Sequence, residues 1–213
     1  MNERAKLVIW GASGHAKVVA DIIRLRGEHE IVGFLDDRDP TGRPFFGSQV
    51  LGGRDRLPSL REQGVSRLLF GFGDGTARLE LTPFVLRLGF TLATAIHPSA
   101  VVAADVSVGA GSVVAAGAVV GPGTRVGENV IVNTLAGVDH DCVLGDGAHV
   151  CPGARLGGWA EAGECAWVGI GATVRDRVKI GRRAVIGAGA VVLHDVPDEV
   201  VAYGVPARVI RGS

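Results

Sequence analysis

The chain has 213 residues, of which 47% are apolar, and its 22 Lys and Arg residues balance 22 Asp and Glu residues. This length suits one or two domains with a sizeable core, and the balanced charge gives no electrostatic reason to expect a nucleic acid partner. Because the three Cys residues show no disulfide-framework spacing and the N-terminal apolar run is too short for a signal sequence, we expect a cytoplasmic protein without membrane insertion.

The N-terminal part of the chain alternates strand and helix signals, with apolar runs separated by Gly-containing turns. Strands are predicted at residues 6–10, 31–35, 67–72 and 91–96, and helices at residues 16–26, 54–64 and 76–88. Alternation of this kind is typical of a sheet covered by helices. We therefore predict a Rossmann-like α/β domain over residues 1–93.

The turn at residues 11–15 opens the first predicted helix and is a candidate nucleotide-binding element. Free backbone N–H groups at the start of a helix can bind a phosphate. Asp36 follows Gly14 at about the distance at which an acidic residue meets a ribose in nucleotide-binding folds. The Gly11-x-x-Gly14 spacing disfavours a dinucleotide cofactor, and a turn that serves only packing is the alternative.

From Ile96 to Val192, every sixth residue is Val, Ile or Leu, with Ala162 as the exception. A helix repeats near 3.6 residues and an ordinary strand at 2, so this period predicts short strands that turn a corner every six residues. Three such faces make one coil of a solenoid, with the aliphatic side chains inside. We predict that residues 94–213 form this second domain and that residues 203–208, which leave the repeat, cap its open edge.

The Gly that usually follows each aliphatic residue is missing around residues 138–142. His140 and His149 lie in the same region, and Asp141 follows His140 directly. Polar residues gathered on a regular scaffold indicate a site. An imidazole beside a carboxylate suits general-base catalysis, whereas a plain surface histidine at a coil corner is the alternative.

A metal site is a further alternative for these histidines. His140-x-Cys142 and His149-x-Cys151 have the spacing of paired ligands. The six-residue period, however, places Cys142 inside the coil, out of reach of His140, and no third histidine is suitably placed. We therefore expect no metal.

Two motifs in combination resemble one enzyme family over nearly the full length of the chain. They are Gly-Ala-Ser-Gly-His-Ala-Lys-Val-Val at residues 11–19, with Phe-Leu-Asp-Asp at residues 34–37, and Asp-His-Asp-Cys-Val-Leu-Gly-Asp-Gly-Ala-His-Val at residues 139–150. The combination is similar to the hexapeptide-repeat acetyltransferases that make bacillosamine- and perosamine-type N-acetylated sugars, and to the related sialic acid O-acetyltransferases. This resemblance implies a left-handed parallel β-helix, against the general preference for right-handed crossovers.

The resemblance also implies roles for individual residues. His140 corresponds to the general base, with Asp141 beside it. Ser13 departs from the commoner Gly-Gly-His form of the first motif. The other implied positions are His149, Gly158, Ile170 and Ala188 for acetyl-CoA, and Ser13, Gly14, His15, Asp36, Asp37, Gly73 and Asn133 for the nucleotide sugar.

We therefore expect a homotrimer that transfers an acetyl group from acetyl-CoA to an amino group of a nucleotide-linked sugar, by direct attack on the thioester. One alternative is O-acetylation of sialic acid or of another sugar hydroxyl. A second alternative, from a different class, is a trimeric binding scaffold without catalysis.

Overall fold

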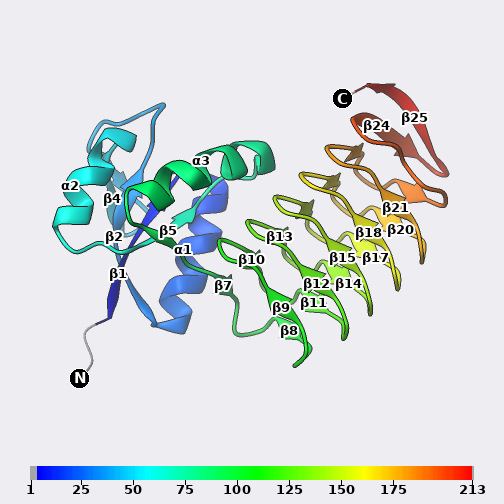
Figure 1. The fold of residues 1–213 in the computed structure, drawn as a ribbon, viewed down its shortest axis with the longest axis horizontal. Helices are drawn as coiled ribbons and strands as arrows, with labels where there is room; N and C mark the ends of the chain where they lie inside the picture. Colours follow the sequence, from blue (N-terminus) through cyan, green and yellow to red (C-terminus); the bar gives the residue numbers. More distant parts are fainter. Residues whose placement is uncertain (1–3, 213) are drawn as a thin grey trace. The chain divides into compact units, whose positions relative to one another are not determined.

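The computed structural model describes residues 4–212 (Figure 1). The chain divides into two compact units, one up to Pro98 and one from Ser99 onwards. The first unit is an α/β domain, and the second is a coil of two-residue strands.

The first unit is built on a sheet ordered β3-β4-β2-β1-β5-β6, in which every pairing except β3 with β4 is parallel. Its strands are β1 (Ala5–Trp10), β2 (His29–Leu35), β3 (Pro44–Phe45), β4 (Ser48–Gly52), β5 (Arg67–Phe70) and β6 (Thr91–Leu92). Its helices are α1 (Gly14–Arg26), α2 (Leu57–Glu62), which follows the 3-10 turn η1 (Arg54–Arg56), and α3 (Gly75–Arg87). The predicted α/β fold of the N-terminal part is confirmed.

The structure differs from the sequence prediction in three places. β3 and β4 form a hairpin that turns at Phe46 and Gly47, both with positive φ, and Pro44 at its start hides the strand pattern. The helix predicted at 54–64 is η1 followed by α2, and the strand predicted at 91–96 is β6 followed by β7 (Ala95–Ile96).

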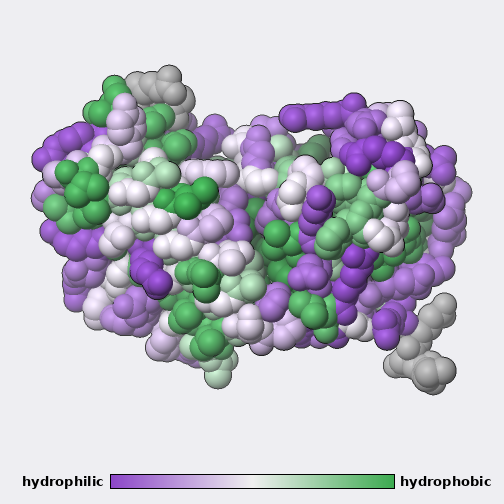
Figure 2. Space-filling model, turned by 180° about the vertical axis from the view of Figure 1, so that it is seen from behind, coloured by the Kyte–Doolittle hydropathy of each residue, from purple (hydrophilic) through white to green (hydrophobic). Residues whose placement is uncertain are grey.

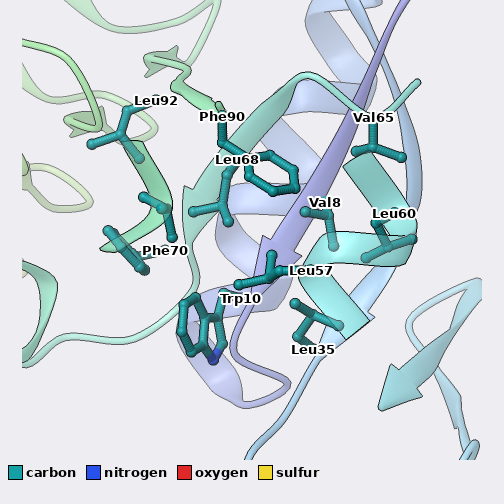
Figure 3. Packing of buried hydrophobic residues seen from close by; sticks show 11 residues of the cluster. Val8, Trp10, Leu35, Leu57, Leu60, Val65, Leu68, Phe70, Phe90 and Leu92 are labelled. Atoms are coloured by element: carbon teal, nitrogen blue, oxygen red, sulfur yellow. The ribbon is translucent and has the colours of Figure 1, made fainter. Parts of the chain in front are cut away.

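The core of the first unit packs the central strands against α2 and α3 (Figure 3). It consists of Val8, Trp10, Leu35, Leu57, Leu60, Val65, Leu68, Phe70, Val85, Phe90 and Leu92. The ring centroids of Trp10 and Phe70 lie 5.9 Å apart at the ends of β1 and β5. Aromatic packing therefore supports the point where β1 passes into the turn at residues 11–15.

The second unit stacks coils of eighteen residues. Val119 pairs with Gly137, Gly137 with Arg155 and Arg155 with Thr173, so each strand lies next to the strand eighteen residues earlier. Three parallel sheets result, which we call sheets I, II and III. Because successive strands belong to I, II and III in turn, the sheets form the sides of a triangular prism.

Sheet I contains β8 (Val101–Val102), β11 (Val119–Val120), β14 (Gly137–Val138), β17 (Arg155–Leu156), β20 (Thr173–Val174) and β23 (Val191–Val192). Sheet II contains β9 (Ser107–Val108), β12 (Arg125–Val126), β15 (Val143–Leu144), β18 (Glu161–Ala162) and β21 (Lys179–Ile180). Sheet III includes β10 (Val113–Val114), β13 (Ile131–Val132), β16 (His149–Val150), β19 (Trp167–Val168), β22 (Val185–Ile186), β24 (Val200–Gly204) and β25 (Ala207–Gly212).

The six-residue period reflects the burial of one aliphatic side chain per strand inside the coil, as expected. The second residue of each strand from Val114 to Val192 is buried, and so are the small residues that precede the strands, such as Ala136 and Ala172. Beyond the repeat, β24 pairs in parallel with β22, and β25 pairs antiparallel with β24. This hairpin covers the edge of sheet III at the end of the coil.

No helix within residues 4–212 combines the length and apolar character needed to cross a bilayer. On the face drawn in Figure 2, apolar side chains form several patches between polar ones. Apolar side chains that are exposed on sheet I include Val101 and Val119.

Candidate active site

A cavity of about 470 Å³ lies in the first unit, at the carboxyl ends of β1 and β2. Its lining comprises Trp10, Gly11, Ala12, Ser13, Asp36, Asp37, Arg38, Arg54, Phe72, Asp74, Ala77 and Leu81. Parallel α/β folds bind ligands in the crevice outside the carboxyl ends of their strands. Three of the predicted substrate-binding residues, Ser13, Asp36 and Asp37, therefore meet in one cavity.

The turn between β1 and α1 forms part of this cavity. A Cβ atom at Gly11 would lie 2.9 Å from the carbonyl carbon of Gly71, and Gly11 has a φ of 125°, so only glycine fits. Ser13 is the N-cap residue of α1, and its side chain makes no capping hydrogen bond. The Ser13 side chain therefore does not occupy the N–H groups at the start of α1, which is where helices bind anions.

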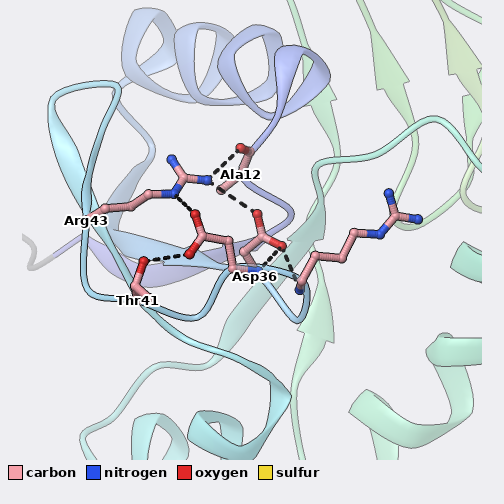
Figure 4. A network of polar contacts seen from close by, with 6 residues as sticks. Ala12, Asp36, Thr41 and Arg43 are labelled. Atoms are coloured by element: carbon pink, nitrogen blue, oxygen red, sulfur yellow. Dashed lines mark hydrogen bonds and ion pairs between the residues drawn. The ribbon is translucent and has the colours of Figure 1, made fainter.

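The two carboxylates at the end of β2 are held by different partners. The Oδ1 atom of Asp36 accepts hydrogen bonds from the backbone N–H groups of Arg38 (3.0 Å) and Asp39 (3.3 Å). Arg43 reaches the second oxygen of Asp36 at 3.5 Å (Figure 4). Asp37 accepts from the backbone N–H of Arg54 at 2.7 Å and from its guanidinium group at 2.7 Å.

His15 and Gly73, two further predicted substrate residues, stand beside the cavity without lining it. Burial, with a smaller contribution from the positive charge of Arg78, lowers the pKa of His15 to about 4. Arg78 is buried and donates a hydrogen bond to the carbonyl oxygen of Phe72 at 3.0 Å. His15 is therefore neutral near pH 7, next to a buried cation.

Among the residues of this cavity that sequence reasoning missed are Trp10 and Arg54. The guanidinium carbon of Arg54 lies 5.4 Å from the ring centroid of Trp10, while its nitrogens bind Asp37. The position of Trp10 directly before the Gly11 turn was the available signal. No local pattern indicates Arg54, because it approaches Asp37 across seventeen residues of chain.

His140 lies at the corner between β14 of sheet I and β15 of sheet II. The coils on both sides hold the backbone there: Asp141 N–H donates to the carbonyl of Pro122 (2.9 Å), and Trp159 N–H donates to that of His140 (3.0 Å). The side chain of Asp139 accepts from His140 N–H at 2.8 Å. The corner is therefore a fixed platform for the imidazole.

The imidazole of His140 is in contact with the carboxylate predicted to accompany it. Its Nδ1 atom lies 2.9 Å from Oδ2 of Asp141. Gly158 lies against the ring, because a Cβ atom there would be 2.7 Å from both Nε2 and Cε1. Gly158, predicted from the family resemblance as an acetyl-CoA position, is thus placed directly beside His140.

An open cavity of about 740 Å³ adjoins His140. It runs over sheet I and its corner with sheet II, and its lining includes Asp139, Arg155, Gly158, Trp159, Thr173, Arg175 and Asp176. Arg155 and Arg175 give this surface two cationic groups. Its length and shallow form suit an extended ligand that carries phosphates.

His149 belongs to a different side of the coil. It lies in β16 of sheet III, and its Nε2 atom is 3.1 Å from Nδ2 of Asn133. The corner of a triangular prism where sheets I and II meet is opposite sheet III. The chain therefore carries His140 and the Asn133–His149 pair on opposite sides of the coil.

The two remaining predicted acetyl-CoA residues lie at the corner between sheets III and I. Ile170 follows β19 and Ala188 follows β22, and both side chains are exposed. They are eighteen residues apart and occupy equivalent positions on neighbouring coils. The structure therefore places them closer to the side of His149 than to His140.

Within residues 4–212, no group of three or more His, Cys, Asp and Glu residues is arranged to hold a metal ion. Cys142 is buried inside the coil, as the period predicts, and its Sγ donates to the carbonyl of Gly157 at 3.2 Å. Burial raises the pKa of Cys142 to about 11 and that of Cys151 to about 12. Both thiols are therefore protonated at neutral pH and unsuited to act as ligands or nucleophiles.

Each of the two units of the chain matches a known protein family. Residues 6–82 match the PglD N-terminal domain, and residues 123–158 and 163–194 match the bacterial transferase hexapeptide repeat. The coil is a left-handed parallel β-helix, as the family resemblance implied.

Solved structures match over almost the whole chain. PerB from Caulobacter crescentus, in complex with CoA and GDP-perosamine, is 43% identical, with a TM-score of 0.92 and coverage of 97% of both chains. The acetyltransferase domain of PglB from Neisseria gonorrhoeae is 39% identical, with a TM-score of 0.92 and coverage of 97% of this chain and all of that one.

Two matches to curated proteins are shorter. GDP-perosamine N-acetyltransferase from Escherichia coli O157:H7 is 31% identical over 142 residues, which are 64% of each chain. The match to galactoside O-acetyltransferase from Lactococcus lactis covers 23% of that protein. The chain thus spans about a quarter to just under two thirds of the length of these relatives.

Proposed function

Because the chain belongs to the hexapeptide-repeat sugar acetyltransferases that carry a PglD-type N-terminal domain, we propose that it transfers an acetyl group from acetyl-CoA to an amino group of a nucleotide-linked sugar. The complex of PerB with CoA and GDP-perosamine and the complex of the PglB domain with acetyl-CoA support both substrates. GDP-linked 4-amino sugars of the perosamine type are therefore the first acceptors to assay.

The observation that carries this proposal is the His140–Asp141 pair. Asp141 engages Nδ1 at 2.9 Å, which leaves Nε2 of the same ring to accept a proton. The sugar amine attacks the thioester carbonyl, Nε2 removes a proton from the attacking nitrogen, and the tetrahedral intermediate collapses to an amide. The CoA sulfur leaves as the thiolate and takes up that proton, so no acyl-enzyme is required.

The two units divide the substrates between them in this proposal. The first unit offers a helix N-terminus for the diphosphate and the carboxylates of Asp36 and Asp37 for hydrogen-bond donors of the nucleoside. The coil offers an extended groove with Arg155 and Arg175 for acetyl-CoA. Each unit thus has the polar groups that its substrate requires.

A homotrimer follows from the opposite placement of the polar groups on the coil. His140 and the Asn133–His149 pair point away from each other in one subunit, so they meet at one substrate only if they come from neighbouring subunits. Closed cyclic symmetry provides such interfaces three at a time. We therefore infer that the active sites lie between adjacent coils of a trimer.

Replacement of His140 tests the assignment of the base. His140→Ala should lower kcat by roughly 10²- to 10⁴-fold, the range for loss of a general base, whereas calorimetry should show unchanged binding of acetyl-CoA. Thiol release from CoA measures the rate, and mass spectrometry distinguishes an N-acetyl amide from an O-acetyl ester. Wild-type turnover by this variant would assign the base elsewhere, and no turnover by the wild type would favour a binding scaffold.

A further inference from the structure

Trp159 stands against the proposed catalytic base. It lies at the same coil corner one coil further on, and the ring centroids of His140 and Trp159 are 4.4 Å apart with an interplanar angle of 88°. An edge-to-face pair at this separation has the preferred geometry for aromatic rings. The indole therefore forms one wall of the space occupied by the imidazole.

A third residue holds this wall in place. The guanidinium carbon of Arg177, from the next coil, lies 4.2 Å from the ring centroid of Trp159. A guanidinium group over an indole face is a favourable cation–π contact. His140, Trp159 and Arg177 thus form a stack along the corner, in which the indole is held from both sides.

The other contacts of His140 show what the Trp159 indole adds to the restraint of the imidazole ring. Asp141 holds one nitrogen, and Gly158 allows the ring to lie against the backbone. The His140 side chain is nevertheless 39% exposed, so these two contacts leave part of the ring uncovered. Trp159 supplies the remaining lateral restraint.

The backbone conformation at Trp159 is energetically unfavourable for a residue of this size. Its φ of 58° lies in the left-handed region, where the equivalent corner positions hold Gly123, Asp141 and Arg177. A bulky residue in this region is strained, and such strain persists where the surroundings over-determine it. The backbone alone would favour glycine here, and the contacts of the indole with His140 and Arg177 offset this cost.

We propose that Trp159, braced by Arg177, is a positioning residue that holds the His140 imidazole in its catalytic orientation; this inference rests on the proposed role of His140 as the base. The indole restrains the ring so that Nε2 faces the attacking amine. A misplacement of about 1 Å at a reacting group can cost on the order of 10²-fold in rate.

Trp159→Gly is the decisive variant. Glycine adopts the left-handed backbone conformation without strain, and the substitution removes the indole that packs against His140. We expect kcat to fall by about 10- to 100-fold, with the KM values for both substrates changed less than about twofold, and Trp159→Phe to restore most of the rate. Arg183→Gly makes the same backbone change at a left-handed position of another corner and serves as the matched control.

A double-mutant cycle separates this inference from the proposed function. In the His140→Ala background, Trp159→Gly should cause no further loss of rate, since the ring that it positions is absent. An additional loss equal to that seen in the wild type would overturn the positioning role while leaving His140 as the base. Full activity of His140→Ala would overturn both, and a raised KM with unchanged kcat in Trp159→Gly would make the indole a substrate contact instead.

Discussion

Asp141 satisfies a backbone requirement and a chemical one at the same position. Its φ is 56°, and Gly123, Trp159 and Arg177 at the equivalent corners are also in the left-handed region. Asp and Asn are among the better tolerated non-glycine residues there. The same residue holds Nδ1 of His140. Glycine would suit this turn but would leave the imidazole without its partner, whereas aspartate is tolerated by the backbone and supplies the carboxylate.

His15 leads to a prediction about stability and pH. Its pKa in the folded protein is about 4, below the value of 6.5 for an unperturbed histidine, because burial and Arg78 disfavour the charged form. The unfolded chain therefore binds a proton first as the pH falls, and stability decreases between pH 6.5 and about 4, by at most about 1.4 kcal/mol per pH unit from this group.

The measurement is the Tm of the wild type and of His15→Gln across this pH range. The variant should lose less of its Tm between pH 6.5 and 4, because glutamine does not titrate. His194→Gln, at an exposed position, is the matched control. Parallel curves for the wild type and His15→Gln would show that another group causes the acid sensitivity.

At the scale of elements, the strands of the coil were predictable because their period has a simple cause. An inward aliphatic residue must occur once on every face of the coil. Val138 and Leu156 therefore indicate the positions of their strands from the sequence alone. The contact between His140 and Asp141 was also predictable, because the two residues are neighbours in the chain. The stack of His140, Trp159 and Arg177 follows from the eighteen-residue register once the corners are aligned.

Other features could not be predicted from local sequence. The hairpin of β3 and β4 has strands too short, and too rich in Pro and Gly nearby, to show alternation. The link from Arg54 to Asp37 depends on how η1 returns to the end of β2. That His140 and His149 face opposite ways depends on the order of three sheets, which single-residue patterns do not reveal.

The turn after β2 carries a prediction for nucleotide recognition. Asp36→Asn keeps an oxygen that can accept from the N–H groups of Arg38 and Asp39, so the turn should persist while the charge is lost. Loss of a charged acceptor should weaken binding of the nucleotide by about 10-fold or more, with acetyl-CoA affinity unchanged. Calorimetry with GDP, UDP and acetyl-CoA tests this.

The control for that experiment is Asp21→Asn, which removes the same charge from an exposed position on α1. Equal affinity of the wild type and Asp36→Asn for both nucleotides would place the nucleoside elsewhere. An equal loss of acetyl-CoA affinity would contradict the division of the two substrates between the two units.

For the whole molecule, the arrangement of the three sheets is the basis of the proposed trimer. Sheets I and II meet at His140, and sheet III carries His149 with Asn133 on the opposite side. Exposed apolar side chains such as Val101, Val119 and Leu135 remain on sheet I and its corner with sheet III. A trimer would cover apolar surface and complete the sites in the same step.

Mixed trimers provide the sharpest test of shared active sites. His140→Ala and His149→Ala homotrimers should each be strongly impaired. If each site takes His140 from one subunit and His149 from its neighbour, co-expression of both variants at equal levels should leave about a quarter of the sites intact. If one subunit supplied both histidines, every subunit of a mixed trimer would carry one lesion and no activity would return. Different affinity tags on the two variants allow the mixed trimers to be purified before the assay, so that absence of recovered activity in them contradicts the shared site.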